Sequence, residues 1–392
     1  MTSADFDDYD DPSVLQPVPG DPPPRRDYDD PGGDRSAPPA RRPGFGFWLA
    51  VAWCLLYVVV SQIIAGLGIF VVLLVVEIVR NGPGVLNDAN QLNAWTRGTP
   101  MLWVAAGSQF AGLALSWLLL RLWCGKSWPR KIALTRLPSP THVALVLIGF
   151  PGMIALSAAV EIPITKYVPN LGEVLQSLGL PVDMKGTSEA IGEMVKHAPW
   201  ALAIFAVAVS PGICEEVFCR GFLGQGLSGR YSTWAVVLMV SFLFGAIHMD
   251  PQQGIGAMLL GAVIHGAYVA TRSLVVAMAV HFANNGLAVV HFNDSLFPVL
   301  DILDGPLKRQ PVLFVLAGLG LFGAACYALY QTRCRLAPAV EGLQGWQSKD
   351  VSGVELPPPN SGTVVTHEPL SPVSAALVAV GAVGFGVMLV LA

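Results

Sequence analysis

Long apolar runs recur along this chain and constrain its fold more than any other feature. A helix needs about 20 apolar residues to cross the hydrocarbon core of a bilayer. Runs of this kind lie at 46–78, 101–122, 142–160, 199–228, 232–249, 254–271, 273–292, 311–331 and 373–392. Backbone polar groups inside lipid must pair within their own segment, which favours helices. The sequence therefore predicts an all-α polytopic membrane protein with about eight to nine transmembrane helices.

Composition agrees with a membrane protein and excludes one class of partner. Only 13% of the 392 residues are charged, whereas soluble domains carry about 25%. The chain has no basic stripe, so we expect no nucleic-acid partner. Six cysteines form no CxxC pair and are expected to be small buried side chains. Cys219 lies within a polar motif, but a nucleophilic thiolate would need a cationic neighbour, and a packing role is favoured.

The polar segments divide the chain. The first 44 residues contain ten Asp and five Arg, and such a composition predicts a disordered cytoplasmic tail. Its acidic start predicts no cleavable signal peptide. A proline-containing flexible linker and a final anchor, expected to be dispensable for chemistry, follow the main helices. The predicted segments are the tail 1–44, N-terminal helices and loops 45–198, motif-bearing helices 199–292, a further transmembrane helix 293–335, the linker 336–372 and a C-terminal transmembrane anchor 373–392.

Basic residues in the loops assign an orientation. Cytoplasmic loops of membrane proteins carry an excess of Lys and Arg. Placing the basic loops on one cytoplasmic side is self-consistent and puts the N-terminus in the cytoplasm, with the plasma membrane as the expected location. The residues concerned are Arg41, Arg42, Lys126, Arg130, Lys131, Arg136, Arg230, Arg272, Arg333 and Arg335.

Ionisable side chains within the apolar runs concentrate between residues 215 and 285. Each costs about 2.5–3.5 kcal/mol at a helix centre on insertion scales, so such groups are paired or functional. Glu216 and Arg220 are four residues apart and share a helix face. Glu215 is then left without a partner in its own helix, which suits a general base or a metal ligand. The alternative is a structural pair with Glu215 facing water.

Two further motifs supply complementary groups. His248 follows Phe244 by four residues, and Asn285 follows His281 by four residues on one helix face. With Glu215 they provide a base, a group that orients water and donors for an oxyanion, as amide hydrolysis requires. Glu215, His248 and His281 also form a candidate Zn²⁺ ligand set with an open position for water. The remaining histidines, including His265, are expected to be structural.

The ordered motifs EExxxR, FxxxH and HxxxN resemble those of the CAAX prenyl endopeptidase and bacteriocin-processing (CPBP, or Abi) family of intramembrane proteases. The resemblance covers roughly residues 199–292. It implies that Glu215 and His248 activate the attacking water, and that His281 and Asn285 stabilise the oxyanion or contact a metal. The Glu216–Arg220 pair would hold the site together. Members are discussed both as metal-dependent and as glutamate-dependent, so both mechanisms stay open.

The resulting hypothesis is a membrane-embedded endopeptidase with a catalytic cavity inside its helix bundle. Its substrate would be a membrane-associated or C-terminal peptide or protein, met at the lipid bilayer. The alternative is a non-enzymatic binding protein, such as a bacteriocin-immunity factor or a transporter. One conflict accompanies the hypothesis: His281 is about 10 Å from the cytoplasmic end of its helix, whereas His248 approaches the opposite end. Convergence would require tilted or offset helices.

Overall fold

A computed structural model describes residues 44–180, 186–293, 305–306, 308–342, 345–348 and 353–391. The acidic tail predicted from the sequence lies outside these residues, apart from Gly44. The chain divides into a unit that ends at Arg41 and a second unit that starts at Arg42, and everything below concerns the second unit.

The described residues are mostly helical. The elements are α1 (Phe47–Val58), η2 (Val59–Gly66), α2 (Leu67–Asn81), η3 (Pro83–Leu86), α3 (Ala89–Thr96), α4 (Thr99–Cys124), η4 (Gly125–Ser127), α5 (Trp128–Lys131), α6 (Pro140–Tyr167), α7 (Leu171–Ser177), α8 (Thr187–Lys196), α9 (Trp200–Ala203), η5 (Ile204–Val209), α10 (Ser210–Glu216), η6 (Val217–Gly224), α11 (Gln225–Ser228), α12 (Thr233–Ala246), α13 (Pro251–Thr271), α14 (Leu274–Phe292), α16 (Pro311–Gln331), β1 (Arg335–Pro338), β2 (Thr363–Thr366) and α17 (Pro372–Leu391).

Eight helical segments of the described chain are long and apolar enough to cross a membrane, and α12 is a ninth, shorter apolar helix. The predicted all-α polytopic fold is therefore confirmed. The segment Trp200–Ser228 is the central helix, because 67% of its most apolar window is buried, compared with 39% or less in the other seven spans. The motif EExxxR lies on this central helix.

The first span is one continuous helix, Phe47–Asn81, of 35 residues. At 1.5 Å per residue it is about 52 Å long, well beyond the roughly 30 Å of the hydrocarbon core. The helix must tilt or extend past the membrane, as its long apolar run predicted. Its middle turns, η2, are π-helical, and the same wide geometry recurs in η5 and η6, directly before and after α10.

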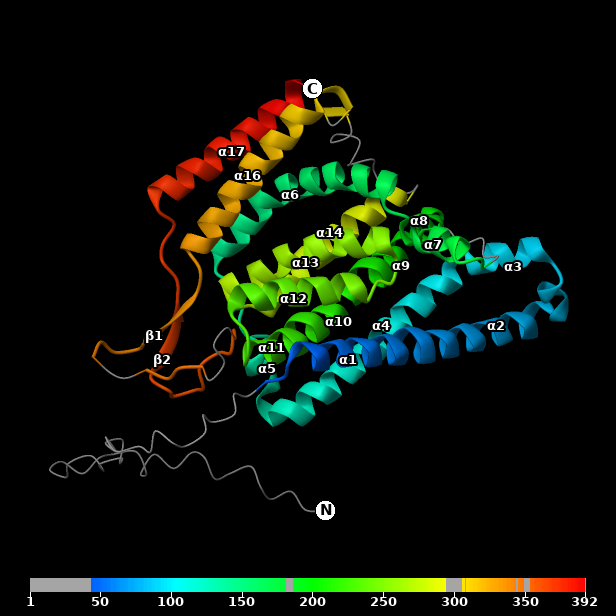
Figure 1. The fold of residues 1–392 in the computed structure, drawn as a ribbon, viewed down its shortest axis with the longest axis horizontal. Coiled ribbons are helices and arrows are strands. Elements are labelled where there is room, and N and C mark those ends of the chain that lie inside the picture. The colour runs from blue at the N-terminus through cyan, green and yellow to red at the C-terminus, as the bar shows by residue number, and fades with distance from the viewer. Residues whose placement is uncertain are drawn as a thin grey trace, which may run out of the picture. The chain divides into compact units, whose positions relative to one another are not determined.

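Two residues, Arg272 and Ser273, separate two spans whose boundary was the least defined in the sequence. Arg272 has a left-handed backbone with φ +45°. This conformation ends α13 and turns the chain back so that α14 starts at Leu274. The helices α13 and α14 pack against each other, as do α12 and α13 and also α10 and α14. Figure 1 shows these motif-bearing helices side by side, with α6, α16 and α17 on one side of them and α1 and α4 on the other.

The loops rich in basic residues meet at one end of the bundle, which we call the basic end. Arg136 donates to the Thr271 carbonyl, and the Cys334 amide donates to the Ala270 carbonyl. These contacts join the α5–α6 connection and the end of α16 to the turn between α13 and α14. Three of the basic loops that were expected on one side of the membrane, those of Arg136, of Arg272 and of Arg333 and Arg335, therefore lie together.

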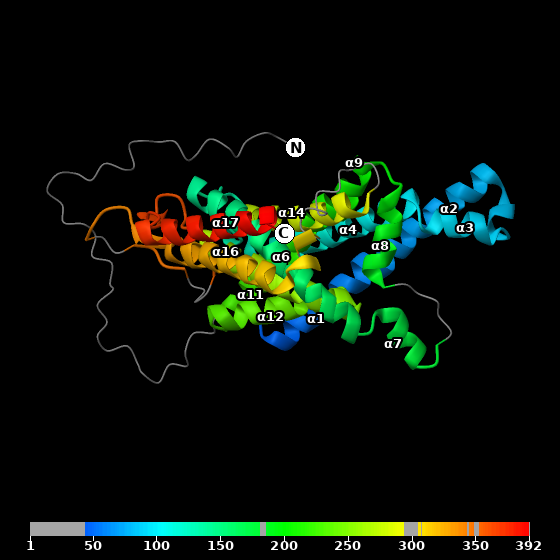
Figure 2. The same ribbon diagram turned by 90° about the horizontal axis from the view of Figure 1, so that it is seen from above.

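The segment after α16 differs from the predicted flexible linker. Strands β1 and β2 form an antiparallel pair, and Val354, Glu355 and Leu356 are buried against the basic end. The Glu355 carboxylate lies 3.0 Å from both Arg130 and Lys131. The described part of this segment is therefore a packed strap, because its acidic and apolar side chains have partners there. Figure 2 shows the last helix, α17, alongside α16, and the two helices are in contact.

Candidate active site

The motif EExxxR forms the centre of a buried polar network. Arg220 and Glu216 are both 0% exposed, and their side chains are 2.7 Å apart. The predicted pair therefore exists. Arg220 also donates to the Gly261 carbonyl of α13 at 3.1 Å, and its guanidinium lies 4.4 Å from the centre of the Phe244 ring of α12. One arginine thus links three of the motif-bearing helices.

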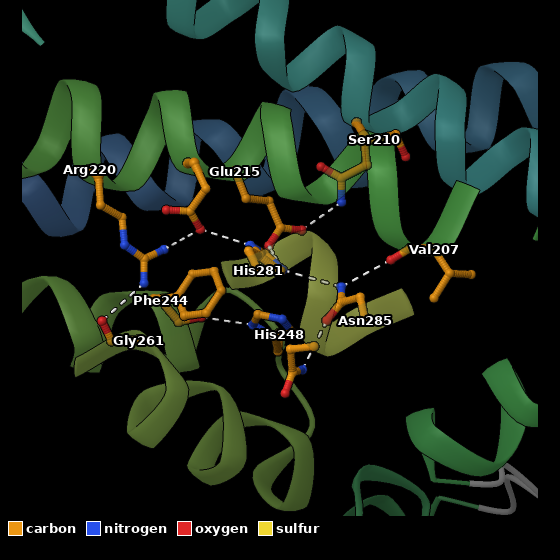
Figure 3. Close-up of polar contacts among 12 residues, drawn as sticks. Val207, Ser210, Glu215, Arg220, Phe244, His248, Gly261, His281 and Asn285 are labelled. Atoms are coloured by element: carbon orange, nitrogen blue, oxygen red, sulfur yellow. Dashed lines mark hydrogen bonds and ion pairs between the residues drawn. The ribbon is translucent and has the colours of Figure 1, made fainter. Parts of the chain in front are cut away.

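The network continues from Glu216 to the third motif. The Glu216 carboxylate lies 2.7 Å from His281 Nδ1, a contact between residues 65 positions apart that the sequence did not predict. Asn285 Nδ2 lies 3.2 Å from His281 Nε2 and donates to the Val207 carbonyl in η5 at 3.0 Å. Figure 3 shows this chain of contacts from Arg220 across His281 to Asn285 and Val207.

The partners of Asn285 fix the state of the His281 ring. A carbonyl oxygen only accepts, so the Asn285 atom that faces Val207 is the amide nitrogen. The same nitrogen faces His281 Nε2, which must then accept, and His281 carries its proton on Nδ1 toward Glu216. His248 is oriented by the same logic, because its Nδ1 lies 2.7 Å from the Phe244 carbonyl. Its Nε2 lone pair is therefore left for another group.

Glu215 has one satisfied and one unsatisfied oxygen. Its Oε1 accepts a hydrogen bond of 2.7 Å from Gln109 of α4. Its Oε2 is buried and has no hydrogen-bond partner among the described residues, and it lies 4.0 Å from His281 Nε2. An unsatisfied carboxylate oxygen beside an imidazole is a place where a water molecule or a reacting group can bind.

Gln109 is a site residue that sequence reasoning missed. The Tyr57 hydroxyl lies 3.4 Å from Gln109 Oε1, and this contact turns the amide nitrogen toward Glu215. Tyr57 is 1% exposed, and its ring stacks on Phe218 with centroids 4.1 Å apart. The signal available in the sequence was a lone amide within the apolar run 101–122, where an unpaired polar group is costly.

The structure brings most of the predicted site residues together. Glu215, Glu216, Arg220, His281 and Asn285 form one network. His248 joins it through Phe244, whose ring lies 5.1 Å from the His248 ring and 5.5 Å from the His281 ring, both edge-on. A direct contact between His248 and Glu215 is absent from the described residues.

A short helix explains how His248 approaches the other motifs. Helix α12 has 14 residues, about 21 Å at 1.5 Å per residue, so it ends well short of a full membrane crossing. His248 lies two residues beyond its end, in the connection to α13. The offset helix end that convergence was expected to require is therefore present.

The residues expected to be structural lie outside the network. Cys219 is 0% exposed and belongs to the apolar core. His265 packs edge-on against Tyr268, and His142 is bonded to the Thr332 carbonyl.

The predicted zinc ligands are Glu215, His248 and His281. Zinc in proteins takes three or four ligands around one point. No group of three or more His, Cys, Asp or Glu side chains in the described residues is placed to hold a metal ion. His281 Nδ1 already faces Glu216, and His281 Nε2 already faces Asn285. As arranged, these residues do not fit a three-ligand zinc site, and the zinc set remains a prediction from the sequence.

Together the fold and the site define a polytopic membrane protein with a buried carboxylate–imidazole–amide network inside its helix bundle. Residues 197–287, which include all three motifs, match the family model of the Type II CAAX prenyl endopeptidase Rce1-like proteins. The resemblance identified from the motifs is thereby confirmed. No curated protein and no solved structure matches the chain.

Proposed function

We propose that this protein is an intramembrane endopeptidase that uses Glu215 and His248 to activate water. The observation that carries the proposal is the buried, unsatisfied Oε2 of Glu215, 4.0 Å from His281 Nε2. Glu216 Oε2 is likewise buried without a hydrogen-bond partner among the described residues, but the other oxygen of Glu216 pairs with Arg220 and His281. Most buried polar groups in proteins have a hydrogen-bond partner, so the free oxygen of Glu215 beside an imidazole supports a role in binding water. The family match supports the same activity.

In the proposed reaction, Glu215 Oε2 takes a proton from a water molecule whose oxygen attacks the peptide carbonyl carbon. His248 Nε2 accepts the second hydrogen of that water and orients it. Collapse of the tetrahedral intermediate breaks the C–N bond, and the proton held by Glu215 passes to the leaving amine. We assign oxyanion stabilisation to Asn285, whose side-chain N–H that faces His281 Nε2 would turn to the carbonyl oxygen as negative charge develops there.

We infer that the substrate is a membrane-associated peptide or a C-terminal tail of a protein, and that the basic end faces the cytoplasm. The clustering of Arg130, Lys131, Arg136 and Arg272 at one end of the bundle supports this orientation. A substrate reaching the site from that side would meet the network about midway along the central helix.

The direct test is cleavage by the purified full-length protein in lipid nanodiscs. The probe is a peptide ending in farnesyl-Cys-Val-Ile-Ser, with the same peptide lacking the farnesyl group as its control, and products are identified by mass spectrometry. Cleavage of either peptide supports the peptidase, and the ratio reports whether a prenyl group is recognised. Absence of cleavage of both, with the protein folded, would favour a binding protein such as an immunity factor or a transporter.

Metal content separates the two mechanisms left open by the sequence. With Glu215 as the base, active protein should contain far less than one zinc per chain and should keep its activity after treatment with a chelator. The measurement is elemental analysis of an active preparation before and after chelation. Stoichiometric zinc that is lost together with activity would overturn the metal-free mechanism and support the predicted set of Glu215, His248 and His281.

Gln109→Met should lower kcat/KM by about 10-fold or more. The substitution keeps the length of the side chain but removes the donor to Glu215, and a hydrogen bond to a charged group is worth about 1.5–3 kcal/mol. Steady-state kinetics and a thermal melt check this expectation. Tyr57→Phe is a comparison variant that should lower kcat/KM less than Gln109→Met does. The contact of the Tyr57 hydroxyl with Gln109 is long, at 3.4 Å, and it acts on Glu215 only through Gln109. Unchanged kinetics in Gln109→Met would remove this residue from the site.

A further inference from the structure

The connection between α12 and α13, which carries His248, has an unusual backbone. Met249 has a positive φ of +59°, and the Asp250 amide donates to the His248 carbonyl at 2.7 Å. A hydrogen bond across three residues with a positive φ at the centre defines a γ-turn of the rare, strained type. Such a turn needs support from its surroundings.

The Asp250 carboxylate supplies that support, and its two oxygens accept hydrogen bonds from different parts of the chain. Oδ1 accepts from the amides of Gln252 and Gln253 and caps the start of α13. Oδ2 accepts from the Leu171 amide at 3.3 Å and from both the amide and the hydroxyl of Thr187 at 3.2 Å. Asp250 is 2% exposed. One carboxylate thus joins the His248 turn to helices α7 and α8.

The chemistry of these contacts requires a carboxylate. All five groups around Asp250 are donors, and only an ionised carboxyl accepts on both oxygens. Burial favours the neutral carboxyl, but the hydrogen bonds from Gln253, Thr187 and Leu171 outweigh it and hold the pKa of Asp250 below its ordinary value. Gln252 adds a second link, because its side-chain amide donates to the Val168 carbonyl at 2.7 Å.

The partners of Asp250 belong to a segment that also covers the helix of the third motif. We call residues 168–196, in their described parts 168–180 and 186–196, the outer segment. Its helix α8 packs through Val195 against an apolar cluster that includes Leu102 of α4 and Val289 of α14. Val289 is one helical turn beyond Asn285. The outer segment therefore touches the helix of His281 and Asn285 through α8, and the turn of His248 through Asp250.

We infer that Asp250 is a positioning residue for the proposed reaction, which fixes His248 relative to His281 and Asn285 by fastening the outer segment to the γ-turn. The inference rests on the proposed function. His248 has no direct contact with Glu215 among the described residues, so its position depends on what holds its turn. A misplacement of about 1 Å in a catalytic group can cost about 100-fold in rate.

Two substitutions at Asp250 separate this role from simple capping. Ser is as good a helix cap as Asp, but its single oxygen cannot serve both α13 and the outer segment. Asp250→Asn keeps one oxygen that can cap α13. Its amide nitrogen replaces Oδ2 and cannot accept from the three donors that converge there. Both variants should lower kcat by about 10–100-fold with KM within about twofold. Thr187→Val removes one donor from the other side and should give a smaller loss that is not additive with Asp250→Ser.

Asp88 offers a matched control. It caps α3 through the amides of Asn90 and Gln91 and is remote from the network. Asp88→Ser should leave kcat and KM unchanged. A kcat for Asp250→Ser equal to that of the wild type would show that Asp250 is only a cap and would overturn the inference.

Hydrogen exchange gives a second readout that does not depend on activity. In Asp250→Ser, exchange should rise together at Leu171, at Thr187 and at the amides of 248–250, while the first turn of α13 stays protected. Unchanged exchange in the outer segment, or a rise confined to α13, would overturn the inference. If the wild type cleaves no peptide, the proposed function fails, and exchange at the His248 turn still decides whether Asp250 fixes it.

Discussion

Glu215→Gln is expected to reduce peptide hydrolysis by about 10²–10⁴-fold, the usual cost of losing a general base. The amide keeps the size of the side chain, and its oxygen still accepts from Gln109. The atom that replaces Oε2 carries hydrogens and cannot take a proton from water. Single-turnover kinetics on the wild type and the variant measure the effect, and circular dichroism and a thermal melt check that the fold is retained.

The chain provides a matched control for this substitution. Glu161 is an exposed glutamate on α6, another membrane-spanning helix, and it lies outside the network. Glu161→Gln should hydrolyse peptide at the wild-type rate. Near-normal hydrolysis by Glu215→Gln would remove Glu215 as the base and, with it, the mechanism proposed for this site.

Arg220→Ala should destabilise the protein by about 3–5 kcal/mol, the range for removing one partner of a buried ion pair. Arg220 holds Glu216 and the Gly261 carbonyl, and both carboxylate and arginine are fully buried. Without the guanidinium, Glu216 keeps only His281 to offset its buried charge. The loss should be visible as a lower yield of folded protein and a lower melting temperature in detergent.

An exposed pair provides the comparison for Arg220. Arg97 lies 3.6 Å from Glu193, and both side chains are substantially exposed, so Arg97→Ala should cost at most about 1 kcal/mol. The double variant Arg220→Met with Glu216→Gln removes both charges and leaves an oxygen to accept from His281. It should recover much of the stability lost in Arg220→Ala. An unchanged melting temperature in Arg220→Ala would argue that the pair contributes nothing.

The sequence predicted the helical fold and the central pair of this site for a clear physical reason. Charged side chains are conspicuous in apolar helices, and a spacing of four residues places two of them on one helix face. Glu216 and Arg220 were found in this way, and so was the shared face of His281 and Asn285. The apolar runs likewise marked the spans, because their length is set by the bilayer.

Contacts between distant residues were beyond this reasoning. The pairing of His281 with Glu216 depends on how α10 and α14 pack, and spacing along the chain contains no information on that. Gln109 belongs to no motif, and its role is evident only once α4 lies against the central helix. The strap after α16 was predicted to be a flexible linker for the same reason. Arg130 and Lys131, which pair with Glu355, lie more than 200 positions earlier in the sequence.

The wide π-helical turns before and after α10 have a consequence for how related sequences should be aligned. Each residue of a regular α-helix advances the chain by about 100° of rotation, so the direction of Glu215 depends on the exact number of residues in η5. Deleting a single residue in η5 would leave the sequence motif EExxxR unchanged. The carboxylate of Glu215 would nevertheless turn away from His281. Gap placement in η5 and η6 is therefore as informative as the motif letters, and a homologue one residue shorter there should not be assigned the same chemistry on its motifs alone.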